Sequence, residues 1–185
     1  MVKKILAMFF MLCFCSFGLN ARAVDYEQRI RELFEIQNES QDKAHRFSND
    51  RLKFLRAWVL GKKGSTNKLW EKELKLSEIA HQDDITARLE FLENYWAHDF
   101  FRAFDRVEGA ANYLKSSSGV NYIVRLSTTF PGYVTISRKI GKKILHARIR
   151  LDASGNFITD GDDCYSFDQL LSQYCCSNCA PYVIK

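Results

Sequence analysis

The stretch that decides the fold is Asn121-Tyr-Ile-Val-Arg-Leu-Ser127. Its side chains alternate between two faces, so Tyr122, Val124 and Leu126 share one face and the residues between them share the other. This period-two pattern predicts a β-strand. Arg125 is predicted to face inward on a strand that lies centrally in a sheet.

Further strands follow this stretch, and helical segments flank it. Turn residues occur at 128–132, at Gly141 and at 152–156. Between them, the apolar pattern predicts strands at 133–137, 144–150 and 157–159, with His146, Arg148 and Arg150 on one face of the second. A short helix ends at about residue 114, and another spans 166–174 with Ser166 as its N-cap. The order predicted is helix, antiparallel meander, helix.

The N-terminal half has a helical period instead. Apolar residues at three- and four-residue steps predict four helices between residues 25 and 96. The predicted helices and their apolar stripes are 25–44 with Ile30, Leu33 and Phe34; 48–61 with Leu52, Leu55 and Val59; a third after Ser65-Thr66 with Leu69, Leu76 and Ile79; and a fourth after Asp83 with Ile85, Leu89, Leu92 and Trp96. Such stripes pack in a small antiparallel bundle or against the domain that follows.

Residues 1–23 are typical of a secretory signal peptide. Lys3 and Lys4 precede an apolar run from Ile5 to Leu19, and small residues follow at 21–23. A membrane anchor is the alternative, but a spanning helix needs roughly 20 apolar residues and this run is shorter. We therefore expect a signal peptide at 1–23, a helical region at 24–95 and a second domain at 96–185, with no membrane association after cleavage.

The distribution of charge is more informative than its total. The formal net charge is +5, but removal of residues 1–23 lowers Lys+Arg from 27 to 24 against 22 acids, which leaves +2. General attraction to nucleic acid is therefore not expected. Residues 121–150 contain seven basic side chains and no acid, whereas 151–168 contain five aspartates and no base. The first of these segments is suited to bind an anion.

Four cysteines follow the signal segment, namely Cys164, Cys175, Cys176 and Cys179. Export would permit disulfides, although the adjacent pair leaves the pairing open. The CxxC spacing of Cys176 and Cys179 is half of a zinc site, but no second pair or nearby histidine accompanies it. We expect no metal and no cofactor.

Four motifs in order resemble the SH2 (Src-homology-2) family over about residues 96–185. Tyr122-Ile-Val-Arg-Leu-Ser127 resembles the family's Phe-Leu-Val-Arg-Glu-Ser strand, and Gly132 falls where the family turns into its next strand. His146-Ala-Arg-Ile-Arg150 is similar to the family's His-Tyr-Lys-Ile-Arg strand. Segments 155–158 and 166–171 follow in the family's order. The resemblance implies an α+β fold: a central antiparallel sheet flanked by two helices, here preceded by a small helical bundle or extension.

The resemblance also implies a phosphotyrosine site. Its residues would be Arg125 at the floor, the loop hydroxyls of Ser127, Thr128 and Thr129, and further contacts from Arg106, Thr135, His146 and Arg148. An arginine suits the floor because its planar fork holds two phosphate oxygens. The alternative for Arg125 is a structural ion pair, but no acid lies within 121–150. His146 could equally be a hydrogen-bonded structural histidine. Ala147 replaces the family's usual tyrosine, which implies broad peptide selectivity.

These observations predict a non-catalytic module that binds tyrosine-phosphorylated proteins. No phosphatase or kinase motif is present, so we expect no enzyme activity. The alternative is an exported structural or partner-binding protein, stabilised by C-terminal disulfides, with an SH2-like fold and no phosphate recognition. The predicted signal peptide and the predicted phosphotyrosine site together suggest a secreted bacterial effector. Such a protein would be delivered to the host cytosol and would engage host phosphoproteins.

Overall fold

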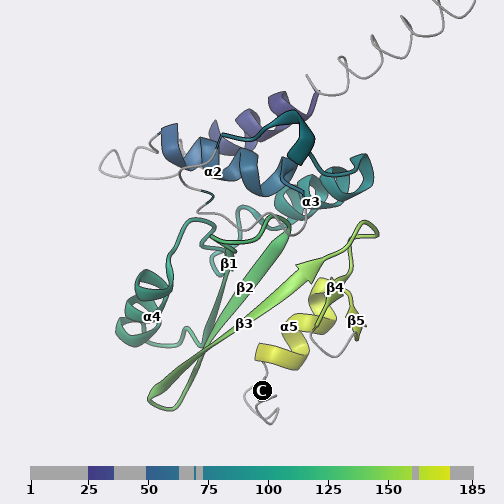
Figure 1. The fold of residues 1–185 in the computed structure, drawn as a ribbon. Coiled ribbons are helices and arrows are strands. Elements are labelled where there is room, and N and C mark those ends of the chain that lie inside the picture. The colour runs from purple at the N-terminus through teal and green to yellow at the C-terminus, as the bar shows by residue number, and fades with distance from the viewer. Residues whose placement is uncertain (1–24, 36–48, 63–68, 70–72, 160–162, 176–185) are drawn as a thin grey trace, which may run out of the picture.

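A computed structural model describes residues 25–35, 49–62, 69, 73–159 and 163–175 of the 185-residue chain. The predicted signal peptide and the pair Cys176 and Cys179 lie outside these residues. Within them, helices and one antiparallel sheet form an α+β fold, as predicted (Figure 1).

The sheet is a five-stranded antiparallel meander in which neighbours in sequence are neighbours in space. Its strands are β1 (Tyr122–Leu126), β2 (Tyr133–Ile140), β3 (Lys143–Leu151), β4 (Phe157–Ile158) and β5 (Cys164–Tyr165). Ile140 pairs with Lys143, so a two-residue turn joins β2 to β3. Gly141 in that turn has φ of 57°, a left-handed conformation that glycine adopts without steric cost. The turn thereby sets the register of the two longest strands.

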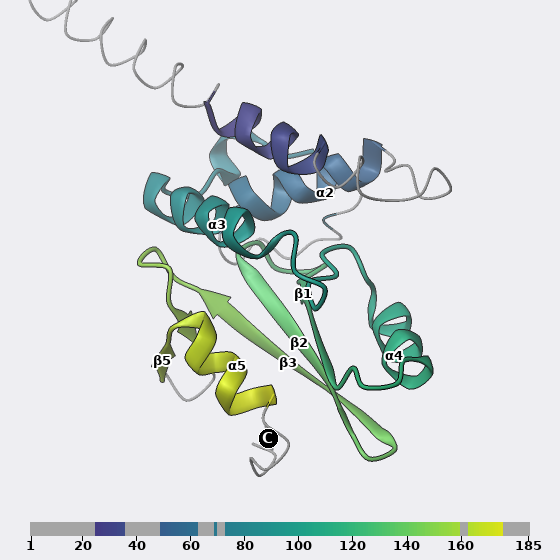
Figure 2. The same cartoon turned by 180° about the vertical axis from the view of Figure 1, so that it is seen from behind.

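Two helices cover opposite faces of this sheet. Helix α4 (Val107–Ser116) packs Ala110 and Leu114 against Ile123, on the face that also carries Arg125. Helix α5 (Phe167–Cys175) packs against the other face, where Val124 belongs to the same hydrophobic cluster. Figures 1 and 2 show the two helices on either side of the sheet.

Ser166 caps α5, as predicted, and Gln169 completes a capping box with it. The backbone N–H of Gln169 donates to Ser166 Oγ at 3.3 Å, and the N–H of Ser166 donates to Gln169 Oε1 at 2.9 Å. These bonds satisfy donors that the first turn of a helix otherwise leaves unpaired.

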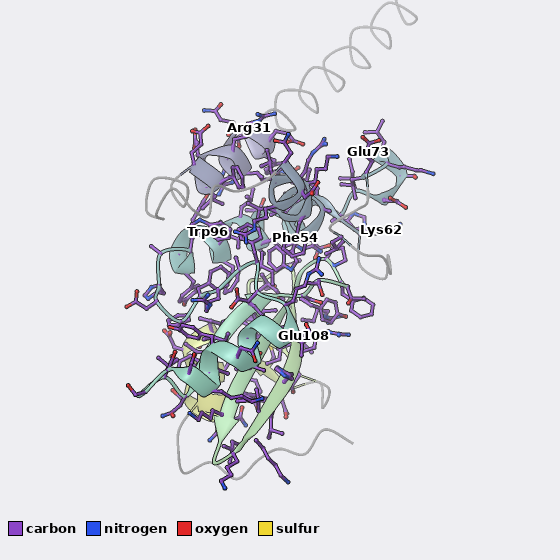
Figure 3. All side chains as sticks on the ribbon, turned by 90° about the vertical axis from the view of Figure 1, so that its left-hand side faces the viewer. Arg31, Phe54, Lys62, Glu73, Trp96 and Glu108 are labelled. Carbon is purple, nitrogen blue, oxygen red and sulfur yellow. The ribbon has the colours of Figure 1, made fainter. Side chains whose placement is uncertain are left out.

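A helical layer lies over one end of the sheet; it comprises residues 25–35, α2 (Asn49–Leu60) and α3 (Gln82–Tyr95). Its buried side chains join the same hydrophobic cluster as those of the sheet and α5. Figure 3 shows Phe54 and Trp96 between the helical layer and the sheet, where both rings meet Phe104 edge-on. The layer is therefore continuous with the core of the domain that follows it.

The prediction of a third helix is wrong over the residues that the structure describes. Residues 73–75 are not helical, Leu76–Glu78 forms only a 3₁₀ turn (η2), and the side chain of Leu76 is 88% exposed. The backbone pairs with the end of α2 instead, because Ala80 N–H donates to Leu60 O and Lys62 N–H to Glu78 O. Ile79 forms an antiparallel bridge with Gly61. Leu69 is buried as expected, whereas the start of the predicted helix at 65–66 lies outside the described residues.

Candidate functional site

Three predicted site residues stand in one row across the sheet. Arg125 on β1 pairs with Thr135 on β2, which pairs with Arg148 on β3. Arg125 and Thr135 are each only 4% exposed, whereas Arg148 is exposed. A buried guanidinium therefore lies below a second one at the surface, on the face that α4 covers.

Ser137 links Arg125 to His146. Arg125 Nε donates to Ser137 Oγ at 3.4 Å, and Ser137 Oγ lies 2.8 Å from His146 Nδ1. A hydroxyl that accepts from arginine still has its own proton to donate. Ser137 Oγ therefore connects the imidazole of His146 to the guanidinium of Arg125.

The loop between β1 and β2, residues 127–132, is organised around Ser127. Ser127 is 2% exposed, and its Oγ accepts from the backbone N–H of Thr129 at 3.4 Å and of Phe130 at 3.2 Å. Its N–H donates to Tyr133 O at 2.9 Å, which closes the loop. Thr128 and Thr129 are half-buried. Ser127 therefore shapes the β1–β2 loop from within, and the two threonines lie closer to its surface.

The electrostatics around Arg125 favour an incoming anion. Burial and the nearby positive charge of Arg148 lower the pKa of Arg125, while Asp105 and Glu108 act in the opposite direction. Among the described residues, no carboxylate forms an ion pair with Arg125.

Arg106 lies at the N-cap of α4 and is exposed. The helix packs across β1 and β2, which brings its N-terminal end to the same face as Arg125. The neighbouring Arg102 is engaged locally: its Nε lies 2.6 Å from Asp105 Oδ2, and its guanidinium lies 4.1 Å from the centre of the Tyr113 ring. The role of Arg106 in ligand contact therefore stays a prediction from the sequence.

Two residues near the site were not predicted. Ser137 could have been found, because it follows Thr135 by two positions on the same strand and so shares its face. Phe130 carried no such signal; it lies in the β1–β2 loop, and the Arg148 guanidinium is 4.8 Å from the centre of its ring. This cation–π contact holds Arg148 next to the loop.

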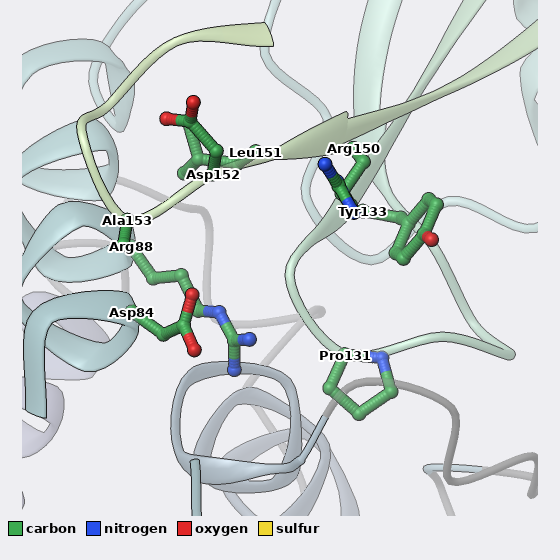
Figure 4. Close-up of a pocket in the computed structure, with 8 residues that line it drawn as sticks. All are labelled: Asp84, Arg88, Pro131, Tyr133, Arg150, Leu151, Asp152 and Ala153. Carbon is green, nitrogen blue, oxygen red and sulfur yellow. The ribbon is translucent and has the colours of Figure 1, made fainter. Parts of the chain in front are cut away.

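A separate pocket of about 220 Å³ lies between α3, the start of β2 and the end of β3 (Figure 4). The predicted phosphotyrosine-site residues do not line it. Elsewhere in the described part of the chain, no cluster of histidine, cysteine and acidic side chains could hold a metal ion. Cys164 is a free, exposed thiol. No described helix has the length and apolar character needed to cross a membrane.

Comparison with known protein families finds a match over the sheet and its two helices. Residues 100–174 match the family model of the SH2 domain. The match contains β1 to β5, α4 and nearly all of α5, and it includes every predicted site residue from Arg106 to Arg148. It supports an SH2 domain protein, and hence a phosphotyrosine-binding module of a kind that is typically non-catalytic. No curated protein matches the chain. The helical layer lies before the matched SH2 residues.

Proposed function

We propose that this SH2 domain binds phosphotyrosine peptides, with Arg125 holding the phosphate. The observation that carries the proposal is a guanidinium that is 4% exposed and has no ion-pair partner among the described residues. A buried charge of this kind is costly unless a ligand supplies the counter-charge. Phosphotyrosine brings about −1.5 to −2 charges and three acceptor oxygens.

The depth of Arg125 favours phosphotyrosine over phosphoserine. Within the described residues, its side-chain hydrogen bond uses Nε, which leaves the terminal nitrogens of the fork for two phosphate oxygens. A phosphate must descend past exposed Arg148 to reach them. The aromatic stem of phosphotyrosine provides that length, whereas the single methylene of phosphoserine does not. Loop N–H groups and the hydroxyls of Thr128 and Thr129 would then complete the phosphate shell.

The proposed binding is broadly selective for the residues around the phosphotyrosine. Ala147 is partly buried, and its neighbour Leu145 on β3 is 43% exposed. The methyl group of Ala147 is too small to form a pocket wall that would favour one peptide side chain over another. Affinity would then come mainly from the phosphotyrosine itself, without a catalytic step.

Peptide titration tests this proposal. A phosphotyrosine peptide and its unphosphorylated twin are titrated against the wild type, Arg125→Leu and a control, Arg138→Leu. Arg138 is an arginine of β2 on the opposite face from Thr135 and Ser137. We expect Arg125→Leu to weaken phosphopeptide binding roughly 30-fold to several-thousand-fold, because loss of one partner of a buried charge pair costs about 2 to 5 kcal/mol. Equal binding by wild type and Arg125→Leu contradicts the proposal.

We further propose that the protein is secreted by a bacterium and acts on tyrosine-phosphorylated proteins in the host cytosol. Two features support this: the signal-like pattern of residues 1–23 and a pocket suited to a ligand made in eukaryotic cytosol. Fractionation of infected cells tests it, with a periplasmic protein as a control for lysis. Detection only in the bacterial periplasm contradicts delivery.

A further inference from the structure

The end of the helical layer that faces the sheet contacts the β1–β2 loop and the first residue of β2. Trp58 of α2 is fully buried, and its Nε1 donates to Tyr133 O at 2.8 Å. The same carbonyl accepts from Ser127 N–H at 2.9 Å. The carbonyl oxygen of Tyr133 therefore accepts both the bond that closes the loop and a bond from α2, a helix that lies outside the SH2 match.

Two further contacts reach the loop from the same side. The backbone N–H of Leu69 donates to Thr128 O at 3.3 Å. A Cβ placed on Gly61, just after α2, would lie 2.6 Å from Pro131 Cγ. The end of α2 thus packs directly against the proline ring, with no room for a side chain between them.

Arg88 of α3 supports the loop at Gly132. Its side chain is 3% exposed, and its Nη1 donates to the carbonyls of Val59 at 2.8 Å and Gly61 at 2.6 Å. Its Nε is so close to Gly132 that a Cβ there would lie 2.5 Å away. Figure 4 shows this guanidinium reaching from α3 toward Pro131. Arg88 therefore fixes the end of α2 and the last residue of the loop together.

We infer that the helical layer is a positioning element for the phosphate site, with Trp58 and Arg88 as its positioning residues. This inference rests on the proposed phosphotyrosine binding. Trp58 and Arg88 are buried and donate to main-chain carbonyls, so their proposed action on the site goes through the backbone of the loop. They hold the backbone N–H groups of the loop in one arrangement before the ligand arrives. A site that is already ordered binds more tightly, because less conformational freedom is lost on binding.

The test compares Trp58→Phe with Phe54→Leu in the full chain. Phe54 lies one helical turn earlier on α2, is equally buried, and meets the ring of Phe104 edge-on. Both variants weaken the core, but only the first removes the bond to Tyr133 O. Affinity for a phosphotyrosine peptide and hydrogen exchange of the loop amides are measured well below both unfolding transitions. Arg88→Lys, which keeps a charged donor, is a second variant in case Trp58→Phe does not fold.

We expect Trp58→Phe to speed exchange at the 127–132 amides and to weaken phosphopeptide binding roughly ten-fold, the loss that follows if the ordered loop falls to about a tenth of the population. Phe54→Leu should keep wild-type affinity and loop exchange. Arg88→Lys should change loop exchange and phosphopeptide affinity in the same direction as Trp58→Phe. Wild-type behaviour of Trp58→Phe, or equal losses in it and Phe54→Leu, overturns the inference alone. A wild-type chain that does not bind the phosphopeptide overturns the proposed function, and the inference with it.

Discussion

Ser137 Oγ lies 2.8 Å from His146 Nδ1, and the same oxygen accepts from Arg125 Nε at 3.4 Å. The three residues come from β1, β2 and β3, so the chain of bonds runs across the sheet from buried Arg125 and Ser137 to exposed His146. Partial burial and the charge of Arg125 lower the pKa of His146, while Glu108 acts in the opposite direction. Burial and the charge of Arg125 thus both disfavour the protonated imidazole.

This relationship predicts that the pKa of His146 is below 6.5 and rises toward 6.5 in Arg125→Leu. A histidine whose pKa is lowered by folding stabilises the fold above its unfolded pKa. That contribution is lost as the pH falls through the folded pKa. NMR titration of the imidazole in wild type and in Arg125→Leu measures both pKa values directly. A wild-type pKa above 6.5, or no change in Arg125→Leu, contradicts the electrostatic coupling.

Two buried arginines are predicted to affect stability with opposite sign. Arg125 has no ion-pair partner in the described chain, so Arg125→Leu should raise the free energy of unfolding by about 1 kcal/mol or more. Arg88 donates to the carbonyls at the end of α2, and burial lowers its pKa to about 10. Arg88→Leu should lower the free energy of unfolding by about 2 to 3 kcal/mol, because hydrogen bonds from a charged group are lost.

Chemical denaturation at pH 7 measures both changes. A phosphotyrosine peptide should stabilise wild type and Arg88→Leu but not Arg125→Leu, because a ligand stabilises only the folded state that binds it. Strong destabilisation by Arg125→Leu would show that Arg125 has a structural role instead.

Local pattern was sufficient to predict which face of its strand carries Arg125, but the prediction of a central strand is wrong, because β1 lies at one end of the strand order of the sheet. Alternation within a strand depends only on the pleat, so residues 121–127 placed this side chain on the inner face without knowledge of its neighbours. The bond between Ser137 and His146 was not predictable in the same way. It depends on the register of β2 against β3, which the two-residue turn at Gly141 sets.

The failures of prediction have a common cause in contacts between distant segments. Leu76 and Ile79 have helical spacing, yet their backbone pairs with the end of α2, and no local pattern reports that pairing. The contact between Phe130 and Arg148 likewise requires the loop conformation that Ser127 and Trp58 impose. Helical spacing indicated that residues 49–60 are a helix. It did not indicate that the end of this helix would contact the β1–β2 loop.

The contact between Phe130 and Arg148 predicts an energetic coupling in ligand binding. Phe130→Leu removes the aromatic face, and Arg148→Met removes the charge while keeping an apolar stem. Each should weaken phosphopeptide binding, Phe130→Leu by about 2- to 5-fold, since an exposed cation–π contact contributes about 0.5 to 1 kcal/mol. The double variant should lose less binding free energy than the sum of the losses in the two single variants. Isothermal titration of the four proteins measures this cycle, and strict additivity would show that Phe130 does not act through Arg148.

A comparison of Gly132 with Gly155 separates two costs of an alanine substitution: the clash with Arg88 and the strain of a left-handed backbone. Gly132 has φ of 71° and Gly155 has φ of 79°, so alanine at either position costs about 1 to 2 kcal/mol. A Cβ on Gly155 would meet nothing within 4 Å, whereas on Gly132 it would lie 2.5 Å from Arg88 Nε. Arg88 cannot withdraw without losing its bonds to the end of α2.

We therefore expect Gly132→Ala to lower the free energy of unfolding by about 1 to 3 kcal/mol more than Gly155→Ala, the usual cost of overpacking a filled site. Gly132→Ala should also weaken phosphopeptide binding, because the shift of Arg88 displaces the β1–β2 loop. Gly155 lies in the turn between β3 and β4, so Gly155→Ala should leave binding unchanged. In an Arg88→Ala background, where the clash is gone, the two alanine substitutions should cost the same. A persistent difference there would place the cause in the loop backbone rather than in its contact with α3.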